Sequence, residues 1–347
     1  MDTITSSTET TVTSTNTNTN IDNNDNDNDI DYDHDNEYVA IQQDHLLVLQ
    51  HGLNATDGDY IVMKDVLAKS HPTMMVYAAK SNNTSLFNQA THQGIDACGD
   101  RLFNEIVQLT KQYQEQIKKI SIIGHSLGGL ITRHAIGKLY QHGYFNNVQP
   151  IQYISLSSPH CGSRRPKSTA FNKLACVFTD AMIKMTGKQL MLTDDPENPL
   201  LLKMTDPNDI YYKGLELFKS RILYSNIEND IQVNFCTSDM THRNPYTKRV
   251  GKVEELIEMI FHEKYPHIIN PSTQAPFVPV GEDSFKNEEK RQQLLKMLQN
   301  LQTLTFDRYH CYFKNFLSHT NVIMKRSYLN NEGQDVIQHV NDHLIDE

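Results

Sequence analysis

The amino-acid sequence predicts an α/β fold in which a mostly parallel β-sheet carries helices on both faces. Along the 347 residues, short apolar runs alternate with stretches of helical periodicity, and this order is typical of parallel sheets with crossover helices. The runs are almost continuously apolar, as expected for strands that are buried on both faces. Each run ends in turn or polar residues, which collect at the carboxyl edge of such a sheet.

The predicted strands are the apolar runs that precede these turns. They are His45–Gln50, Met74–Ala79, Lys119–Ile123, Ile151–Leu156, Arg221–Ile227 and Thr305–Phe313. The last run mixes apolar and polar residues, which is typical of an edge strand. Apolar residues at helical spacing predict helices between and after the strands. These helices are Gly94–Glu115, Leu127–Gln141, Val253–Phe261, Asn287–Leu301 and Gly333–Asp346.

Composition divides the chain near residue 37. Residues 1–37 hold ten acidic residues, no Lys or Arg, and mostly Thr, Ser, Asn and Asp. Such a segment cannot bury enough apolar surface to offset the entropy of ordering, so we expect a disordered tail. The rest, 38–347, is predicted to be a single domain, with an irregular loop at 262–285.

Residues 161–220 stand out as an insertion between two predicted strands, and we expect it to be helical and lid-like. Its Leu and Met side chains suit an adaptable acyl pocket or a lid; the alternative is a second small helical layer with its own core. These side chains are Leu174, Met182, Met185, Leu190, Met191, Leu200, Leu201, Leu202 and Met204.

Charge and cysteine content narrow the function classes. The net charge of −10 comes from the acidic tail, and no basic stripe predicts nucleic-acid binding. We expect neither a secretory signal nor a membrane-spanning helix. The five cysteines are odd in number and lack paired spacing, which predicts reduced thiols and a cytoplasmic location. They are Cys98, Cys161, Cys176, Cys236 and Cys311.

The stretch SIIGHSLGGL at 121–130 places a serine at the end of a predicted strand and the start of a predicted helix. A sharp strand-to-helix turn exposes the hydroxyl of such a serine, and the turn needs small flanking residues, here Gly124 and Gly128. The alternative is a glycine-rich turn with a bystander serine. Because strand and helix patterns lie on the expected sides, Ser126 is the candidate nucleophile.

A nucleophilic serine needs backbone donors for the oxyanion that forms on its substrate. The N–H of Leu127, at the start of the following helix, is the first candidate. The loop after HLLVLQ supplies the second, because Gly52 permits close approach and the N–H of Leu53 follows it.

The serine also needs a histidine base and a carboxylate that orients it, and both are expected after later strands. RILYSNIEND offers Glu228 and Asp230, whereas the last strand and its loop offer His310 and His319. Position favours Asp230 and His319.

His339 and His343 lie four residues apart on the last predicted helix, as a pair of metal ligands would. No third ligand stands nearby in the sequence, so we expect a solvated helix face. No metal or cofactor is predicted.

Taken together, these segments resemble the serine esterase, or lipase-like, alpha/beta-hydrolases, a domain family long described as of unknown function. The resemblance covers about residues 44–346. It rests on HLLVLQHGLNAT, IIGHSLGGLITRHAIGKLY, YISLSSPHCGSR, LYSNIENDIQV and FLSHTNVIMK, among others. It implies an alpha/beta-hydrolase fold with Ser126 as nucleophile, Asp230 as acid and His319 as base.

The resemblance also implies the reaction, which is hydrolysis of carboxylic esters. Family members that cleave monoacylglycerols or phospholipids make acyl-lipid esters the expected substrates, and an apolar lid would suit peripheral contact with a membrane or lipid droplet. A protease or a thioesterase would use the same machinery. The alternative from another class is a catalytically silent hydrolase fold that serves as a lipid-binding or interaction module.

Overall fold

A six-stranded sheet organises the chain in the computed structural model, which describes residues 43–85, 88–113, 116–163, 184–250, 253–270 and 288–346. The strand order is β2-β1-β3-β4-β5-β8, and all neighbours are parallel. The strands are β1 (His45–Gln50), β2 (Met74–Ala78), β3 (Lys119–His125), β4 (Gln149–Leu156), β5 (Ser220–Asn226) and β8 (Asp307–Cys311). All six predicted strands are confirmed, and β8 lies at an edge of the sheet as expected.

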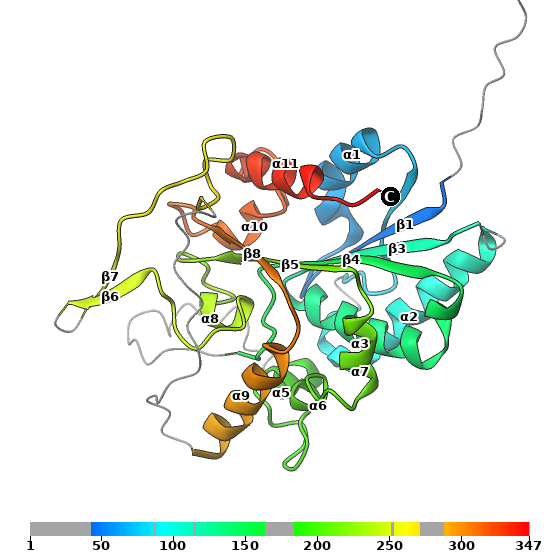
Figure 1. Cartoon of the computed structure of the whole chain (residues 1–347), viewed down its shortest axis with the longest axis horizontal. Helices are drawn as coiled ribbons and strands as arrows, with labels where there is room; N and C mark the ends of the chain where they lie inside the picture. Colours follow the sequence, from blue (N-terminus) through cyan, green and yellow to red (C-terminus); the bar gives the residue numbers. More distant parts are fainter. Residues whose placement is uncertain are drawn as a thin grey trace, which may run out of the picture. The chain divides into compact units, whose positions relative to one another are not determined.

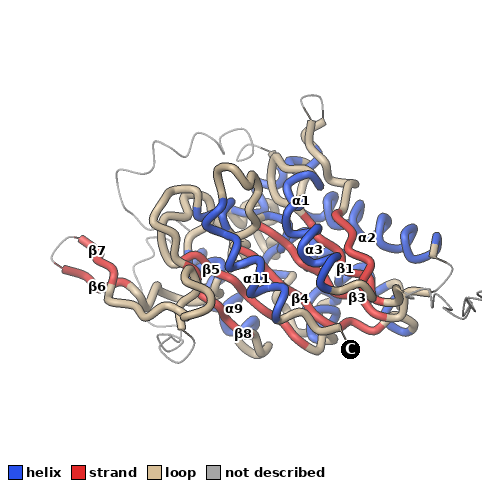
Figure 2. The backbone as a smooth tube through the Cα atoms, turned by 90° about the horizontal axis from the view of Figure 1, so that it is seen from above, coloured by secondary structure: helices blue, strands red, loops and turns tan. Residues whose placement is uncertain are grey.

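Helices cover both faces of this sheet (Figure 1). One face carries α2 (Ile95–Gln112), α3 (Leu127–Gln141), α5 (Met185–Leu190), α6 (Leu200–Lys203), α7 (Ile210–Glu216) and α9 (Glu288–Leu301). The other carries α1 (Ile61–Ser70) and α11 (Gln334–Asp342), which Figure 2 shows lying over the strands. Each face has its own apolar core, so the predicted α/β architecture is confirmed.

Short elements complete the described part of the chain. They are α8 (Phe235–Ser238), α10 (Ser318–Asn321), the 3₁₀ turns Asp57–Tyr60, Ala90–His92, Tyr144–Asn146 and Asn331–Gly333, and a hairpin of β6 (Thr247–Val250) and β7 (Val253–Leu256). Apolar side chains around the hairpin and α8 form a third, smaller core.

Helix α3 lies at the centre of its layer, where most of its residues are buried, Arg133 and His134 among them. A Cβ added at Gly137 would stand 2.3 Å from the Tyr211 ring, so this glycine lets α7 approach α3 closely. The buried residues of α3 therefore fix the position of the helix, and only Ser126 separates its first residue, Leu127, from the end of β3 at His125.

The described part of the predicted insertion, 184–220, packs into the same core as α2 and α3. Leu190, Leu201 and Met204 are buried there, whereas Met185 and Met191 are exposed. Leu174 and Met182 lie outside the described residues. A lid within 161–220 stays a prediction.

The predicted helix Val253–Phe261 is wrong, because its first part is strand β7. Helix α1 was not among the predicted elements. The predicted tail, 1–37, lies outside the described residues. Among the helices that the structure describes, none is long and apolar enough to cross a membrane.

The pair His339 and His343 corrects the expectation of a solvated helix face. His339 is buried, its Nδ1 lies 2.7 Å from the Tyr224 hydroxyl, and its ring stacks on that of His343 at 3.9 Å. Burial lowers the pKa of His339 to about 3. In the described residues no group of three or more His, Cys, Asp or Glu is placed to hold a metal ion.

Candidate active site

Ser126 sits at the turn between β3 and α3, where the backbone is strained. Its φ of 57° and ψ of −130° are unusual for a residue with a side chain. A Cβ at Gly124 would stand 2.6 Å from the Cα of Gly129, and one at Gly128 would stand 2.1 Å from the Gln50 carbonyl oxygen. The glycines on both sides of the serine therefore permit the sharp turn that the sequence predicted.

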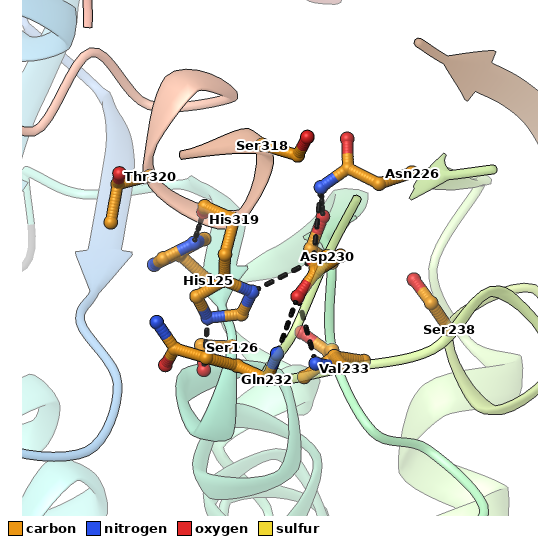
Figure 3. A network of polar contacts seen from close by, with 12 residues as sticks. His125, Ser126, Asn226, Asp230, Gln232, Val233, Ser238, Ser318, His319 and Thr320 are labelled. Carbon is orange, nitrogen blue, oxygen red and sulfur yellow. Dashed lines mark hydrogen bonds and ion pairs between the residues drawn. The ribbon is translucent and has the colours of Figure 1, made fainter. Parts of the chain in front are cut away.

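The structure brings Ser126, His319 and Asp230 together from three distant parts of the chain (Figure 3). The Nε2 atom of His319 lies 2.8 Å from Ser126 Oγ, and its Nδ1 lies 2.9 Å from Asp230 Oδ2. A carboxylate only accepts hydrogen bonds, so Nδ1 carries the proton and Nε2 accepts from the serine hydroxyl. Ser126 is 8% exposed and His319 is 3% exposed, which limits access of water.

The Asp230 carboxylate is held by backbone and side-chain donors besides His319. The backbone N–H groups of Gln232 and Val233 donate to Oδ1 at 3.0 and 2.8 Å, and Asn226 Nδ2 donates to Oδ2 at 3.0 Å. These bonds compensate the charge and fix the orientation of the carboxylate. Asn226 was not predicted, although it stands four residues before Asp230 at the end of β5.

His125 is a second residue whose position the sequence analysis did not assign. Its Nε2 lies 2.7 Å from the carbonyl oxygen of His319, and the two rings are 4.8 Å apart. Burial lowers the pKa of His125 well below its ordinary value, so the ring is neutral and Nε2 donates to the carbonyl. His125, which precedes Ser126 in the chain, therefore supports the backbone of His319, whose ring contacts Ser126.

The two predicted oxyanion donors lie on the segments that flank Ser126. Leu127 is the first residue of α3, where an N–H has no partner within the helix. No acceptor among the described residues takes the N–H of Leu53. A Cβ on Gly52 would stand 2.7 Å from Ser126 Cβ, so the loop that carries Leu53 passes directly beside the serine.

A buried network holds this loop in place. His51 Nε2 lies 3.1 Å from Asn83 Oδ1, which also accepts from the Asp57 backbone N–H at 2.9 Å. Burial lowers the pKa of His51. His51 Nδ1 also lies 3.1 Å from the Gly52 carbonyl oxygen, so the single N–H of the neutral ring faces an acceptor in either tautomer. Through Nε2 the ring reaches the segment after β2.

The alternative acid and base occupy other positions. Glu228 is exposed and makes no contact with His319 among the described residues. His310 lies in β8, where its Nε2 is 2.9 Å from Asp239 Oδ1 and its Nδ1 is 2.6 Å from the Tyr246 hydroxyl. The geometry therefore separates His310 from the serine and joins His319 to it.

Comparison with known proteins decides the family. A family model described as "Putative serine esterase" matches residues 40–241, more than half of the chain. The chain belongs to this serine esterase family. The matched residues include Ser126 and Asp230, whereas His319 follows beyond them.

Curated relatives of this serine esterase are named as lipases. "Putative lipase ROG1" of Saccharomyces cerevisiae is 33% identical over 267 residues, which cover 74% of this chain and 36% of that protein. "Putative lipase C4A8.10" of Schizosaccharomyces pombe is 29% identical over 225 residues, covering 62% of this chain and 28% of the relative. The chain thus matches about a third of the length of these relatives.

Solved structures are more distant. Carboxyl esterase 2 from Tuber melanosporum is 10% identical, with a TM-score of 0.43, over 87% of this chain and 77% of that chain.

Proposed function

We propose that the chain hydrolyses carboxylic esters, with Ser126 as nucleophile, His319 as base and Asp230 as the acid that orients it. The observation that carries the proposal is the hydrogen-bonded series from Ser126 Oγ through His319 to Asp230, at 2.8 and 2.9 Å. This series lies at the carboxyl ends of the strands, on the strained turn between β3 and α3.

In the first half of the reaction, Ser126 Oγ bonds to the ester carbonyl carbon while His319 Nε2 takes the hydroxyl proton. Negative charge develops on the carbonyl oxygen, which the N–H groups of Leu53 and Leu127 stabilise. Asp230 stabilises the imidazolium. The bond to the alcohol then breaks, and His319 returns its proton to the departing oxygen.

In the second half, water attacks the acyl-serine ester, and His319 takes the proton of that water. The second tetrahedral intermediate collapses, the acid leaves, and Ser126 Oγ recovers a proton from His319. Every proton moves between groups of this chain and the reactants, so the proposed reaction includes no step at a metal or cofactor.

We propose acyl-lipid esters, such as those of monoacylglycerols or phospholipids, as the substrate class. The names of the curated relatives support this class. A cytoplasmic location with peripheral contact with a lipid surface fits the proposal. The buried thiols of Cys98 and Cys311 also fit this location, because neither forms a disulfide with a residue that the structure describes.

The experiment that tests the function is hydrolysis of p-nitrophenyl esters of increasing acyl length by the wild type and Ser126→Ala. We expect activity that rises with chain length in the wild type, and a kcat at least about 10³-fold lower in the variant. A fluorophosphonate probe should label only the wild type. Equal activity in both proteins would refute the assignment of Ser126.

A further inference from the structure

The segments on either side of α10, the helix that carries His319, expose an unusual group of side chains. Apolar and basic residues occur together there, and the apolar ones are between 42% and 77% exposed. We call them the α10 surface: Lys314, Phe316, Leu317, Arg326, Tyr328 and Leu329. A contiguous group of exposed apolar side chains on a folded protein commonly marks a contact site.

The charge of this region has one sign. Residues 308–331 include four basic residues and no acidic one. Lys325 pairs with Asp59 at 2.7 Å, and Arg308 lies 3.7 Å from Asp239. Lys314 and Arg326 form no ion pair with any residue that the structure describes. The α10 surface therefore presents uncompensated positive charge beside its apolar side chains.

Side-chain amides join the two segments to α10. Asn330 Nδ2 donates to Asn321 Oδ1 at 2.7 Å and to Thr320 Oγ1 at 2.9 Å. On the other side of α10, Asn321 Nδ2 donates to Asn315 Oδ1 at 3.3 Å, and Asn315 Nδ2 donates to Glu332 Oε2 at 2.8 Å. These bonds fix both segments to the helical turn that holds His319. Whatever binds the α10 surface is consequently held near the candidate catalytic residues.

We propose that the α10 surface docks the protein on a lipid surface that carries anionic headgroups. Exposed apolar side chains insert at the boundary between headgroups and acyl chains, and adjacent Lys and Arg are attracted to anionic lipids. Residues 308–331 contain no acidic side chain, and the Glu332 carboxylate that follows them accepts a hydrogen bond from Asn315. The inference rests on the proposed function, since it would place Ser126 close to esters in that surface.

The test is flotation of the full chain with vesicles of phosphatidylcholine alone or mixed with phosphatidylserine. Ser126→Ala is the parent protein, so that lipid is not consumed and binding is measured apart from catalysis. We expect the parent to float with the mixed vesicles more than with the neutral ones, and less as salt is raised.

Two double variants separate the charge from the apolar contribution. Lys314→Gln with Arg326→Gln should weaken partitioning into the mixed vesicles about tenfold, because each cation near such a surface contributes to binding. Leu317→Ser with Leu329→Ser should weaken partitioning into both kinds of vesicle by about tenfold. Thermal unfolding of each variant checks that it folds.

A matched control lies before the amino end of β5, whereas the α10 surface follows the carboxyl end of β8. Leu217 is 46% exposed and Lys219 is exposed, and both precede the amino end of β5. Leu217→Ser with Lys219→Gln should leave vesicle binding unchanged. If this control loses as much binding as the α10 variants, the surface is not the docking site.

Other results would also overturn the proposal. One is that the parent does not float, and another is that it floats equally with both kinds of vesicle. A third is a molar mass in solution that shows a dimer held together through Leu317 and Leu329. Hydrolysis of a soluble short-chain ester by the wild type is scored separately. Vesicle binding without ester hydrolysis would support the docking surface and refute the proposed function. Hydrolysis without vesicle binding would support the proposed function and refute the docking surface.

Discussion

At the scale of single residues, the site depends on how closely Gly52 approaches Ser126. An added Cβ would stand 2.7 Å from Ser126 Cβ and 3.1 Å from Oγ. Gly52→Ala must therefore displace either Ser126 or the loop that carries Leu53. We expect kcat to fall at least about 100-fold, since one oxyanion donor alone contributes that much elsewhere.

Gly58→Ala is the control for this prediction. The nearest neighbour of the added Cβ would be the Thr56 hydroxyl at 3.3 Å. Gly58 itself is exposed, in the 3₁₀ turn Asp57–Tyr60. Ester hydrolysis by this variant should match the wild type. Full activity in Gly52→Ala would show that the loop can shift without harm to the site.

The two carboxylates of the IEND segment make a second residue-scale test. Asp230 contacts His319, whereas Glu228 is exposed, with a pKa raised by partial burial. Asp230→Asn keeps the shape but loses the charge and favours the wrong tautomer of the histidine, which costs about 10⁴-fold in kcat in a comparable triad. Glu228→Gln should change kcat little. A larger effect at Glu228 would reverse the assignment.

At the scale of elements, the pair of His310 and Asp239 ties the segment after α8 to strand β8. Both side chains are buried, and Tyr246 contacts the other ring nitrogen of His310. His310→Leu removes the donor that faces a buried carboxylate, so the free energy of unfolding should fall by about 3 kcal/mol. Urea unfolding measures this loss.

His319→Leu is the counterpart to that variant. It should abolish ester hydrolysis while changing the urea midpoint less than His310→Leu does, because the His319 ring lies beside the reacting serine. If His310→Leu is the variant that loses activity at unchanged stability, the two histidines have exchanged roles.

The strands of the sheet were predictable from the sequence, whereas β7 was not. The strands have a nearly continuous apolar pattern that fits only a sheet covered on both faces, because neighbouring residues such as Leu46 and Leu47 are buried in the two different cores. The stretch Val253–Phe261 has helical spacing, but β7 pairs with β6 and Leu256, Ile257 and Phe261 pack on the third core. Tertiary pairing therefore overrode a local pattern that fits either structure.

The site was predictable to a similar extent. Ser126, Asp230 and His319 follow strand ends, so the order of the strands brings them together. His125 and Asn226 act through contacts with a distant backbone carbonyl and a neighbouring carboxylate. Such partners depend on how loops fold, which no spacing along the chain reveals.

At the scale of the whole molecule, buried neutral histidines link stability to pH. Burial lowers the pKa of His45 to about 4 and that of His339 to about 3, from an ordinary 6.5. It also lowers the pKa values of His125 and His160 well below the ordinary value. Below pH 6.5 these histidines bind protons in the unfolded chain but stay neutral in the folded chain, so the free energy of unfolding falls as pH falls.

Each such histidine removes about 1.4 kcal/mol of stability per pH unit between 6.5 and its folded pKa. For His45 and His339 together the loss at pH 5 is about 4 kcal/mol, a large share of a typical domain's 5–15 kcal/mol. We therefore expect unfolding in mild acid, measured as urea midpoints from pH 7 to pH 4.5.

His339→Asn keeps a polar group near Tyr224 and removes one titrating ring. The slope of the free energy of unfolding against pH should therefore fall by about one proton. His142→Asn, at an exposed position, is the control. A slope that is equally steep in both variants would mean that other groups cause the acid sensitivity.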